Sequence, residues 1–338
     1  MQDNMMKIEN FSIERKEFCE RTLKERLRDE LTIYNDAKKK TLPKHHGNQI
    51  SFRAFKRITP NTDSLVEAVT PDANSLTVTE YAFSVKQYGD WIPLSDRMQN
   101  ESFDQILAET SELLGEEAAE VFNIIMMDKL TKGTNVFYAN AKAKETLTAS
   151  DTITINDLHK MKAIFKRNNV KPFANGKYVL RISPDVEYDF KAQTATNASW
   201  VDIMKYDNSE AIIKGEIGSI AGFKVVVDNT IKTANDRGSG TQKVHLCLAY
   251  GKDAFAAVEL AGENANDIDV IHKGLGSSGT NDPLNQRQTL GWKHNGFGVG
   301  ILYDEALIRY EVAASFDTAG YEVADANRDG YRATNPTE

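Results

Sequence analysis

The chain has 338 residues, of which 41% are apolar and 27% charged, and this balance excludes a predominantly disordered protein. Its 41 Lys and Arg against 49 Asp and Glu leave a net charge of −8, which argues against a dedicated nucleic-acid binder. The charge is uneven, because residues 1–60 carry 14 basic and 9 acidic residues, a net +5, and the remainder carries −13.

The two cysteines, Cys19 and Cys247, are distant in the sequence and form neither a disulfide scaffold nor a zinc motif, which favours a reducing compartment. Residues 1–18 lack the apolar core of a signal peptide, and the longest nearly uncharged apolar stretch, Val121–Met127, is far shorter than a membrane span. We therefore expect a protein that folds in water, without export and without a membrane partner.

A highly charged segment from Glu14 to Lys40 is predicted to form an amphipathic helical arm that ends near Pro43. Its apolar residues recur at mostly helical spacing: Phe18, Leu23, Leu27, Leu31 and Tyr34. Two interpretations stay open with equal weight. The arm is either an ordinary surface helix or an element that docks onto a partner subunit, since so polar an arm has little of its own domain to pack on.

Two stretches rich in Thr, Val, Phe and Tyr, Gly47–Ile58 and Ser75–Ser95, predict the strands of a long hairpin. The turn-rich segment between them carries apolar residues at its tip: Leu65, Val66 and Val69. Because an isolated two-stranded hairpin is marginal in water, we expect a neighbouring subunit to support it.

Residues 102–132 predict the clearest helix, with Ser102 and Gln105 as a capping box and Gly133 as its stop. Acidic side chains load its first half: Glu101, Asp104, Glu109, Glu112, Glu116, Glu117 and Glu120. Carboxylates near the start of a helix are stabilised by the positive end of its dipole. A charged helix face is most often simply exposed to solvent.

The middle of the chain has an α+β pattern. Thr154 and Asp157 predict the cap of one helix, and Ser183 and Pro184 open another. The remaining predicted elements are strands at Lys177–Ile182, Lys243–Ala249 and Ile268–His272, a hairpin at Gly215–Asn229 turning at Ala221–Gly222, a short helix at Lys252–Val258, and strands broken by glycines in Leu290–Ser315.

No catalytic, cofactor-binding or metal-binding residues can be singled out. The segment Gly274–Gly279, GLGSSG, matches a dinucleotide-binding fingerprint in letters, but the sequence after it contains Pro283 and no apolar helical stripe. His45 and His46 are adjacent and face opposite ways on a strand, and the other histidines are scattered singly.

Three blocks of the chain resemble, in the right order, the major capsid proteins of tailed bacteriophages, in particular the branch typified by phage N-four. The first holds LPKHHGNQISFRAF, the tip SLVEAVTPDAN and the return QYGDWIPLSD; the second holds ISPDVEYDF and GEIGSIAGFKVVVDN; the third holds AYGKDAFAAVEL and NDPLNQRQTLGWKHNGFGVGILYDEALIRYEVAAS. The resemblance covers about Leu42 to Ser315. The charged arm before it and the acidic tail after it have no counterpart in the family pattern.

The resemblance implies an α+β fold of the Hong Kong 97 type. The expected parts are an N-terminal arm (1–46), an extended loop hairpin (47–95), a peripheral domain with a long spine helix (96–153), a mainly axial domain (154–285), a return to the peripheral domain (286–315) and an acidic C-terminal tail (316–338).

The function implied is that of a major capsid protein that self-assembles into hexamers and pentamers of an icosahedral shell around phage double-stranded DNA. Expected partners are further copies of the chain, scaffold, portal and decoration proteins, and DNA contacted weakly without sequence specificity; the expected location is the virion capsid, assembled in the host cytoplasm. One alternative is an encapsulin-type nanocompartment subunit, which shares the fold but encloses a protein cargo. The other is a soluble cytosolic enzyme, which requires a pocket with converging titratable groups.

The expected intersubunit contacts involve the hairpin and the predicted long helix. The hairpin contributes its basic strand residues Arg53, Lys56 and Arg57 and its apolar tip residues Leu65, Val66 and Val69. The helix of the next subunit contributes Glu109, Glu112, Glu116 and Glu120. Each exposed ion pair is worth only about 0–1 kcal/mol, but a shell repeats the contact many times.

Overall fold

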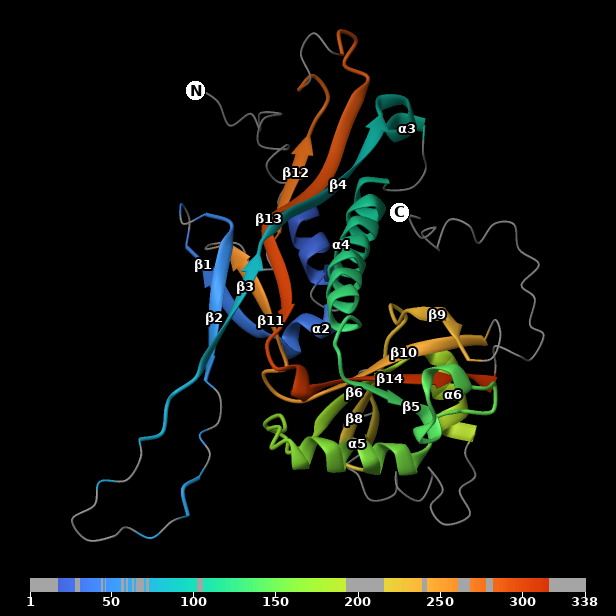
Figure 1. The fold of residues 1–338 in the computed structure, drawn as a ribbon. Helices are drawn as coiled ribbons and strands as arrows, with labels where there is room; N and C mark the ends of the chain where they lie inside the picture. Colours follow the sequence, from blue (N-terminus) through green and yellow to red (C-terminus); the bar gives the residue numbers. More distant parts are fainter. Residues whose placement is uncertain are drawn as a thin grey trace. The chain divides into compact units, whose positions relative to one another are not determined.

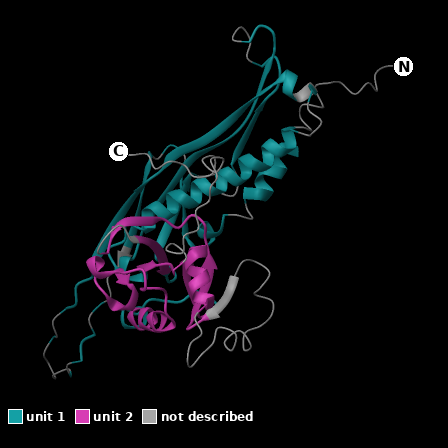
Figure 2. Cartoon of the chain, turned by 90° about the vertical axis from the view of Figure 1, so that its right-hand side faces the viewer, with its two compact units in different colours: residues 1–135, 165–175, 250–308 teal, residues 136–164, 176–249, 309–338 magenta. Residues whose placement is uncertain are grey.

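The computed structural model describes residues 18–27, 31–43, 45, 47–55, 58, 60–62, 64, 70, 73–101, 106–192, 216–238, 242–260, 268–277 and 282–315. The chain divides into two compact units (Figure 2). Unit 1 comprises residues 1–135, 165–175 and 250–308, and unit 2 comprises residues 136–164, 176–249 and 309–338.

Unit 1 is built on a five-stranded sheet around one long strand, β13 (Arg287–Ile301) (Figure 1). β4 (Lys86–Ser95) pairs with one edge of β13. Along its other edge, β12 (Asp269–Lys273) pairs with the first half of β13 and β11 (Phe255–Leu260) with the second half. β1 (Lys38–Leu42) adds to β11 in parallel. The glycines expected to break the strand pattern after Leu290 therefore lie within one continuous strand.

The predicted long helix is present as α4 (Ile106–Leu130), which lies along β13 and is preceded by the short helix α3 (Asp96–Glu101) (Figure 1). The predicted capping box at Ser102 and Gln105 falls outside the described residues. The ring of Phe122 packs on β13 residues Trp292 and Phe297, with centroids 5.7 and 4.7 Å apart. Leu113, which the helical spacing of apolar residues from Phe103 to Leu130 predicts to lie on the buried stripe, is 55% exposed.

The predicted arm is helical over residues 18–27 and in α2 (Thr32–Asp36), but its end is the strand β1, so the helical prediction up to Pro43 is wrong there. Cys19, Leu23, Leu27 and Leu31 are fully buried. The arm packs on α4 of its own chain, where a Cβ at Gly115 would lie 2.7 Å from the Leu23 carbonyl oxygen. The interpretation that these residues dock onto a partner subunit is therefore wrong.

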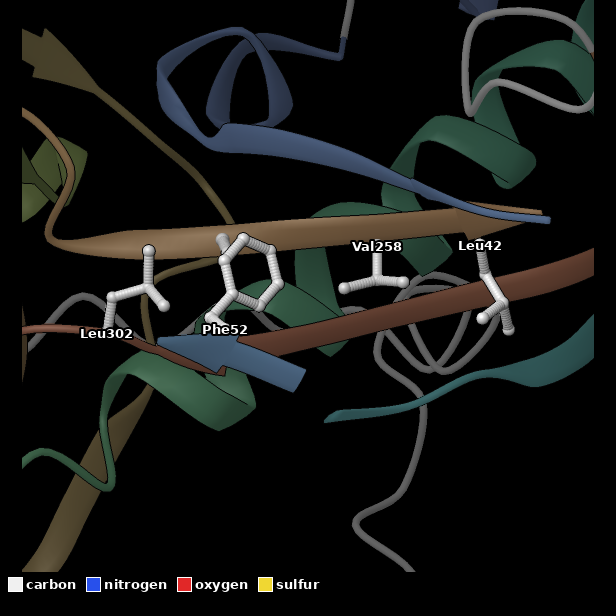
Figure 3. Close-up of a cluster of buried hydrophobic side chains, with 5 residues drawn as sticks. Leu42, Phe52, Val258 and Leu302 are labelled. Atoms are coloured by element: carbon white, nitrogen blue, oxygen red, sulfur yellow. The ribbon is translucent and has the colours of Figure 1, made fainter. Parts of the chain in front are cut away.

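The hairpin is formed by β2 (Gln49–Phe55) and β3 (Val78–Ser84), which pair in antiparallel register from Gln49–Ser84 to Phe55–Val78. Its base is anchored in its own chain by a cluster of buried side chains on β1, β2, β11 and the residue after β13: Leu42, Phe52, Ala256, Val258 and Leu302 (Figure 3). Beyond β3 the chain continues into β4, which is a strand of the main sheet rather than of the hairpin.

Unit 2 is built on a seven-stranded sheet in the order β5-β14-β10-β6-β8-β7, with β9 paired to β10. Its strands are β5 (Val136–Tyr138), β6 (Tyr178–Ile182), β7 (Glu216–Ile220), β8 (Phe223–Val227), β9 (Thr233–Arg237), β10 (Gln242–Tyr250) and β14 (Leu307–Ala313). The predicted β7–β8 turn is confirmed, with Ala221 and Gly222 both at positive φ, as a tight hairpin turn requires.

Two helices of unit 2 begin as the sequence predicts. α5 (Ile155–Arg167) starts after Thr154, whose hydroxyl accepts a hydrogen bond from the Asp157 amide at 3.2 Å. α6 (Pro184–Ala192) starts after Ser183. The predicted helix at Lys252–Val258 is wrong, because these residues lead into strand β11. Short 3-10 turns lie at Ala139–Ala141, Lys144–Thr146 and Asp304–Ala306.

Candidate functional site

The described part of the chain shows neither a metal-binding cluster nor a membrane-spanning helix. Those residues contain no group of three or more His, Cys, Asp or Glu side chains placed to hold a metal ion. Among them there is also no helix long and apolar enough to cross a membrane. The GLGSSG segment leads from β12 into a turn, and the described residues from Asp282 onward continue into β13, so no helix begins within them to receive a pyrophosphate.

A serine, a histidine and an aspartate approach one another where α6 meets β10. The Ser183 hydroxyl lies 2.8 Å from Nδ1 of His245, and Nε2 of His245 lies 3.8 Å from the Asp185 carboxylate. This order resembles a hydrolase triad, but Ser183 is 5% and His245 1% exposed, so a substrate cannot reach them. Ser183 instead accepts a weak hydrogen bond from the Val186 amide and caps α6.

Two further buried polar clusters of unit 2 are structural ion pairs. Arg181 and Asp228 form a buried pair at 3.0 Å that joins β6 to the end of β8. Glu311 on β14 is fully buried and accepts hydrogen bonds from Arg237 and Arg309 at 2.9 and 2.8 Å. Burial raises the pKa of the Cys247 thiol to about 12, so this cysteine stays protonated and unreactive near neutral pH. The two ion-paired clusters join strands of the sheet.

Asp151 holds together the loop that leads into α5. Burial acts to raise the pKa of Asp151, but hydrogen bonds from Lys142, Asn140 and Thr148 outweigh it and lower the pKa to about 2. The Lys142 ammonium lies 2.7 Å from the Asp151 carboxylate, and the Thr148 amide and hydroxyl also donate to it.

We expect Asp151→Asn to destabilise the protein at neutral pH by about 2 kcal/mol, because the folded state holds the carboxylate charged more strongly than the unfolded state does. Since the folded pKa lies below the ordinary value of 3.8, this stabilisation is complete above about pH 4 and is lost as the pH falls towards 2. Urea denaturation of both proteins between pH 7 and pH 2 checks this. A stability difference that does not shrink below pH 4 would contradict it.

The outer half of the hairpin carries apolar side chains that its own chain leaves uncovered. Phe52 at the base is buried, whereas Ile58, Leu76 and Val78 are 51%, 59% and 45% exposed. The hairpin therefore combines an anchored base with an apolar outer part, which is the character of a segment covered by another chain.

Most of the predicted contact residues on the hairpin lie outside the described residues: Lys56, Arg57, Leu65, Val66 and Val69. Arg53 is described and exposed, and stands opposite Glu80 in the β2–β3 register. Its side chain is therefore accessible on the strand that the sequence predicts to contact a neighbour.

The structure brings the predicted acidic residues together along α4. Glu109 and Glu120 are exposed, but Glu112 and Glu116 face the arm of their own chain, where Arg26 lies 3.2 and 3.9 Å from their carboxylates. Glu117 accepts a hydrogen bond from the indole of Trp292 at 2.5 Å, and burial raises its pKa. Two of the four predicted acidic contacts thus have a cation in their own chain.

Phe83 anchors the hairpin to the main sheet, and the sequence prediction did not include it. Its ring packs edge-on against Phe52 at 5.2 Å and covers Gly300 of β13 so closely that a Cβ there would lie 1.7 Å from a ring carbon. The alternation of Ile50 and Phe52 on β2 with the facing Tyr81 and Phe83 on β3 is the signal that could have identified the anchored face.

A family model described as "Phage capsid protein" matches residues 79–310. No curated protein matches the chain. Among solved structures, the capsid of Ralstonia phage GP4 is similar with a TM-score of 0.67 and 13% identity, over 82% of this chain and 87% of that chain. The capsid of cyanophage Pam1 is similar with a TM-score of 0.61 and 14% identity, over 80% of this chain and 86% of that chain. The capsid of cyanophage P-SCSP1u is similar with a TM-score of 0.59 and 16% identity, over 84% of this chain and 88% of that chain.

Proposed function

Since this chain belongs to the phage capsid protein family and has the Hong Kong 97-type fold, we propose that it assembles as hexamers and pentamers around packaged double-stranded DNA. It is a major capsid protein, a structural subunit of the icosahedral virion shell and not an enzyme. Family membership favours this over the nanocompartment and the cytosolic enzyme considered above.

Within that fold, we propose unit 1 as the peripheral domain, with α4 as its spine helix, and unit 2 as the axial domain. The six-part division of the chain remains a prediction. The N-four branch is proposed on the tip motif around Leu65 and the QYGDW return on β4. Scaffold, portal and decoration proteins are the proposed further partners, and contacts to DNA are proposed to be weak because the chain is acidic overall.

The uncovered apolar half of the hairpin is the observation that carries this assembly proposal. Its base needs no neighbour, because Phe52 is buried in its own chain, but Ile58, Leu76 and Val78 remain exposed. In a shell, the next copy removes this surface from water at about 25 cal/mol per Å².

We expect deletion of residues 59–74 to leave a folded subunit that does not form shells. Circular dichroism and thermal denaturation should match the full chain, while electron microscopy after expression with a scaffold should show no closed particles. The control replaces residues 59–74 with a Gly/Ser linker of equal length, which should also fail to assemble. Closed shells of normal size from either variant would overturn the intersubunit role of the hairpin.

A further inference from the structure

Two Asn-Gly dipeptides occur in the chain, and the structure places them in opposite environments. Asn175 and Gly176 lie in the exposed turn between α5 and β6. Asn295 and Gly296 lie within the long strand β13. In such a dipeptide the backbone nitrogen of the glycine can attack the side-chain amide of the asparagine, because glycine has no side chain to obstruct the approach. The same chemistry is therefore present twice, in different settings.

The Asn175–Gly176 dipeptide is open to solvent and unrestrained by hydrogen bonds. Both residues are exposed, and a Cβ at Gly176 would meet no atom within 4 Å. Among the described residues, none forms a hydrogen bond with the Asn175 side chain or with the Gly176 amide. The Asn175 side chain can therefore turn towards the Gly176 nitrogen without breaking a contact to a described residue.

The Asn295–Gly296 dipeptide is instead held in place by its neighbours. The carboxamide oxygen of Asn295 accepts a hydrogen bond from Gln87 at 2.6 Å, and its nitrogen donates to Asp269 at 3.4 Å. The Gly296 amide donates to Nδ1 of His294 at 3.3 Å. A reaction between Asn295 and Gly296 has to break these contacts and open the strand first.

We propose that Asn175 is a site of spontaneous deamidation, at which the chain modifies itself without an enzyme. The backbone nitrogen of Gly176 attacks the side-chain carbonyl carbon of Asn175 and closes a cyclic succinimide. The proton that this nitrogen gives up leaves with the amide group as ammonia. Water then opens the ring at either carbonyl group, so that position 175 becomes aspartate or isoaspartate. The sum of the steps exchanges ammonia for water, and no oxidant or reductant takes part.

The sequence around the dipeptide favours the negative charge that develops during ring closure. No Asp or Glu occurs between Asp157 and Asp185, and Lys177 follows the dipeptide directly. Positive charge nearby stabilises an ionised nitrogen and the oxyanion of the tetrahedral intermediate. The basic residues of this segment are Lys160, Lys162, Lys166, Arg167, Lys171, Lys177 and Arg181.

The product differs from the original chain in charge and in backbone length. Each event turns a neutral amide into a carboxylate, within a segment whose other charged side chains are all basic. Isoaspartate also adds a methylene group to the main chain where it passes from unit 1, which includes residue 175, to unit 2, which resumes at residue 176. A population of chains therefore becomes more acidic with age at one defined position. The inference goes beyond the proposed function and does not depend on assembly.

The test follows the full-length chain over time in water enriched in heavy oxygen, by mass spectrometry of its tryptic peptides. Asn175 should convert at least about tenfold faster than Asn295, the factor that an opening cost of about 1.4 kcal/mol at Asn295 produces. The rate should rise with pH, because the attacking nitrogen has to lose its proton. The product should carry heavy oxygen and include isoaspartate, since direct hydrolysis of the side-chain amide gives aspartate alone.

The chain provides matched controls for both the chemistry and the fold. Asn168 and Asn169 lie in the same tryptic peptide as Asn175 and are exposed, but Asn and Val follow them, so they should stay intact. The variant Asn175→Gln should stay intact as well, because its longer side chain has to close a larger ring, while its circular dichroism should match the wild type. In urea, Asn175 and Asn295 should convert at similar rates, because the contacts that protect Asn295 are lost.

Three results would overturn the proposal. The first is an Asn175 amide that stays intact in the folded chain while it converts in urea, which would show that the turn protects it. The second is conversion at equal rates at Asn175 and Asn295 in the folded chain, and the third is aspartate at position 175 without isoaspartate. All three are measured on the unassembled chain, so they leave the proposed function as it stands.

Discussion

Replacing Asp228 with alanine should destabilise unit 2 by about 3–5 kcal/mol, the usual cost of removing one partner from a buried ion pair. The guanidinium of Arg181 is 1% exposed and lies 3.0 Å from the Asp228 carboxylate, which also accepts hydrogen bonds from the amide and hydroxyl of Thr230. The substitution leaves the Arg181 guanidinium without this carboxylate in a place that water cannot reach. A loss of this size is a large part of the stability of a typical domain.

Urea denaturation of the unassembled subunit, followed by circular dichroism, measures this effect. The control is Lys191→Ala, which removes the partly exposed helix pair of Lys191 and Glu187 and should change stability by about 0–1 kcal/mol. A double variant, Arg181→Met with Asp228→Leu, should recover most of the stability because it removes both charges from the interior. A loss in Asp228→Ala no larger than in the control would contradict the buried-pair argument.

The second large effect is expected at Gly300, where the hairpin base meets β13. A methyl group at this position would lie 1.7 Å from one carbon of the Phe83 ring and 2.1 Å from another, so the ring has to leave its site. Phe83 packs on Phe52 in the anchoring cluster. We therefore expect Gly300→Ala to cost about 1–3 kcal/mol by overpacking and to loosen the hairpin base.

Amide hydrogen exchange of β2 and β3 reports the loosening directly, with protection falling in Gly300→Ala and staying unchanged elsewhere in the sheet. Gly274→Ala is the matched control, because the nearest atom to a Cβ there lies 4.0 Å away. Combining Gly300→Ala with Phe83→Leu should restore part of the protection. Unchanged exchange in Gly300→Ala would show that the hairpin base does not depend on this contact.

The sequence correctly predicts features that depend on a few neighbouring residues. The Thr154 cap of α5, the Ser183 start of α6 and the Ala221–Gly222 turn each depend on contacts within four residues. The long helix is equally visible because its apolar and acidic residues repeat over 25 residues.

The errors concern segments whose structure is decided by distant partners. Lys252–Val258 has the alanine content of a helix, but β13 and β1 pair with β11 on either side and bury Phe255, Ala256 and Val258. Tertiary pairing overrides local propensity there. Lys38–Leu42 becomes a strand for the same reason.

The candidate contact surfaces are also predictable only in part from the sequence. The basic hairpin strand and the acidic helix face were visible in the sequence, but the pairing of Glu112 and Glu116 with Arg26 joins residues 86 and 90 positions apart. Gly115 in the middle of α4 was the available clue, since a glycine there admits the backbone of the arm.

The pairing of β1 with β11 also sets the order of events during synthesis. Lys38–Leu42 pair with Ala256–Leu260, so the first strand of the sheet waits for a partner made more than 200 residues later. At about 5–20 residues per second, that wait lasts roughly 10–40 s. Leu23 waits for less time, because the α4 residue Gly115 against which it packs is made about 90 residues after it. Unit 1 is completed only when residue 308 has been made, so we expect assembly to follow translation of this unit.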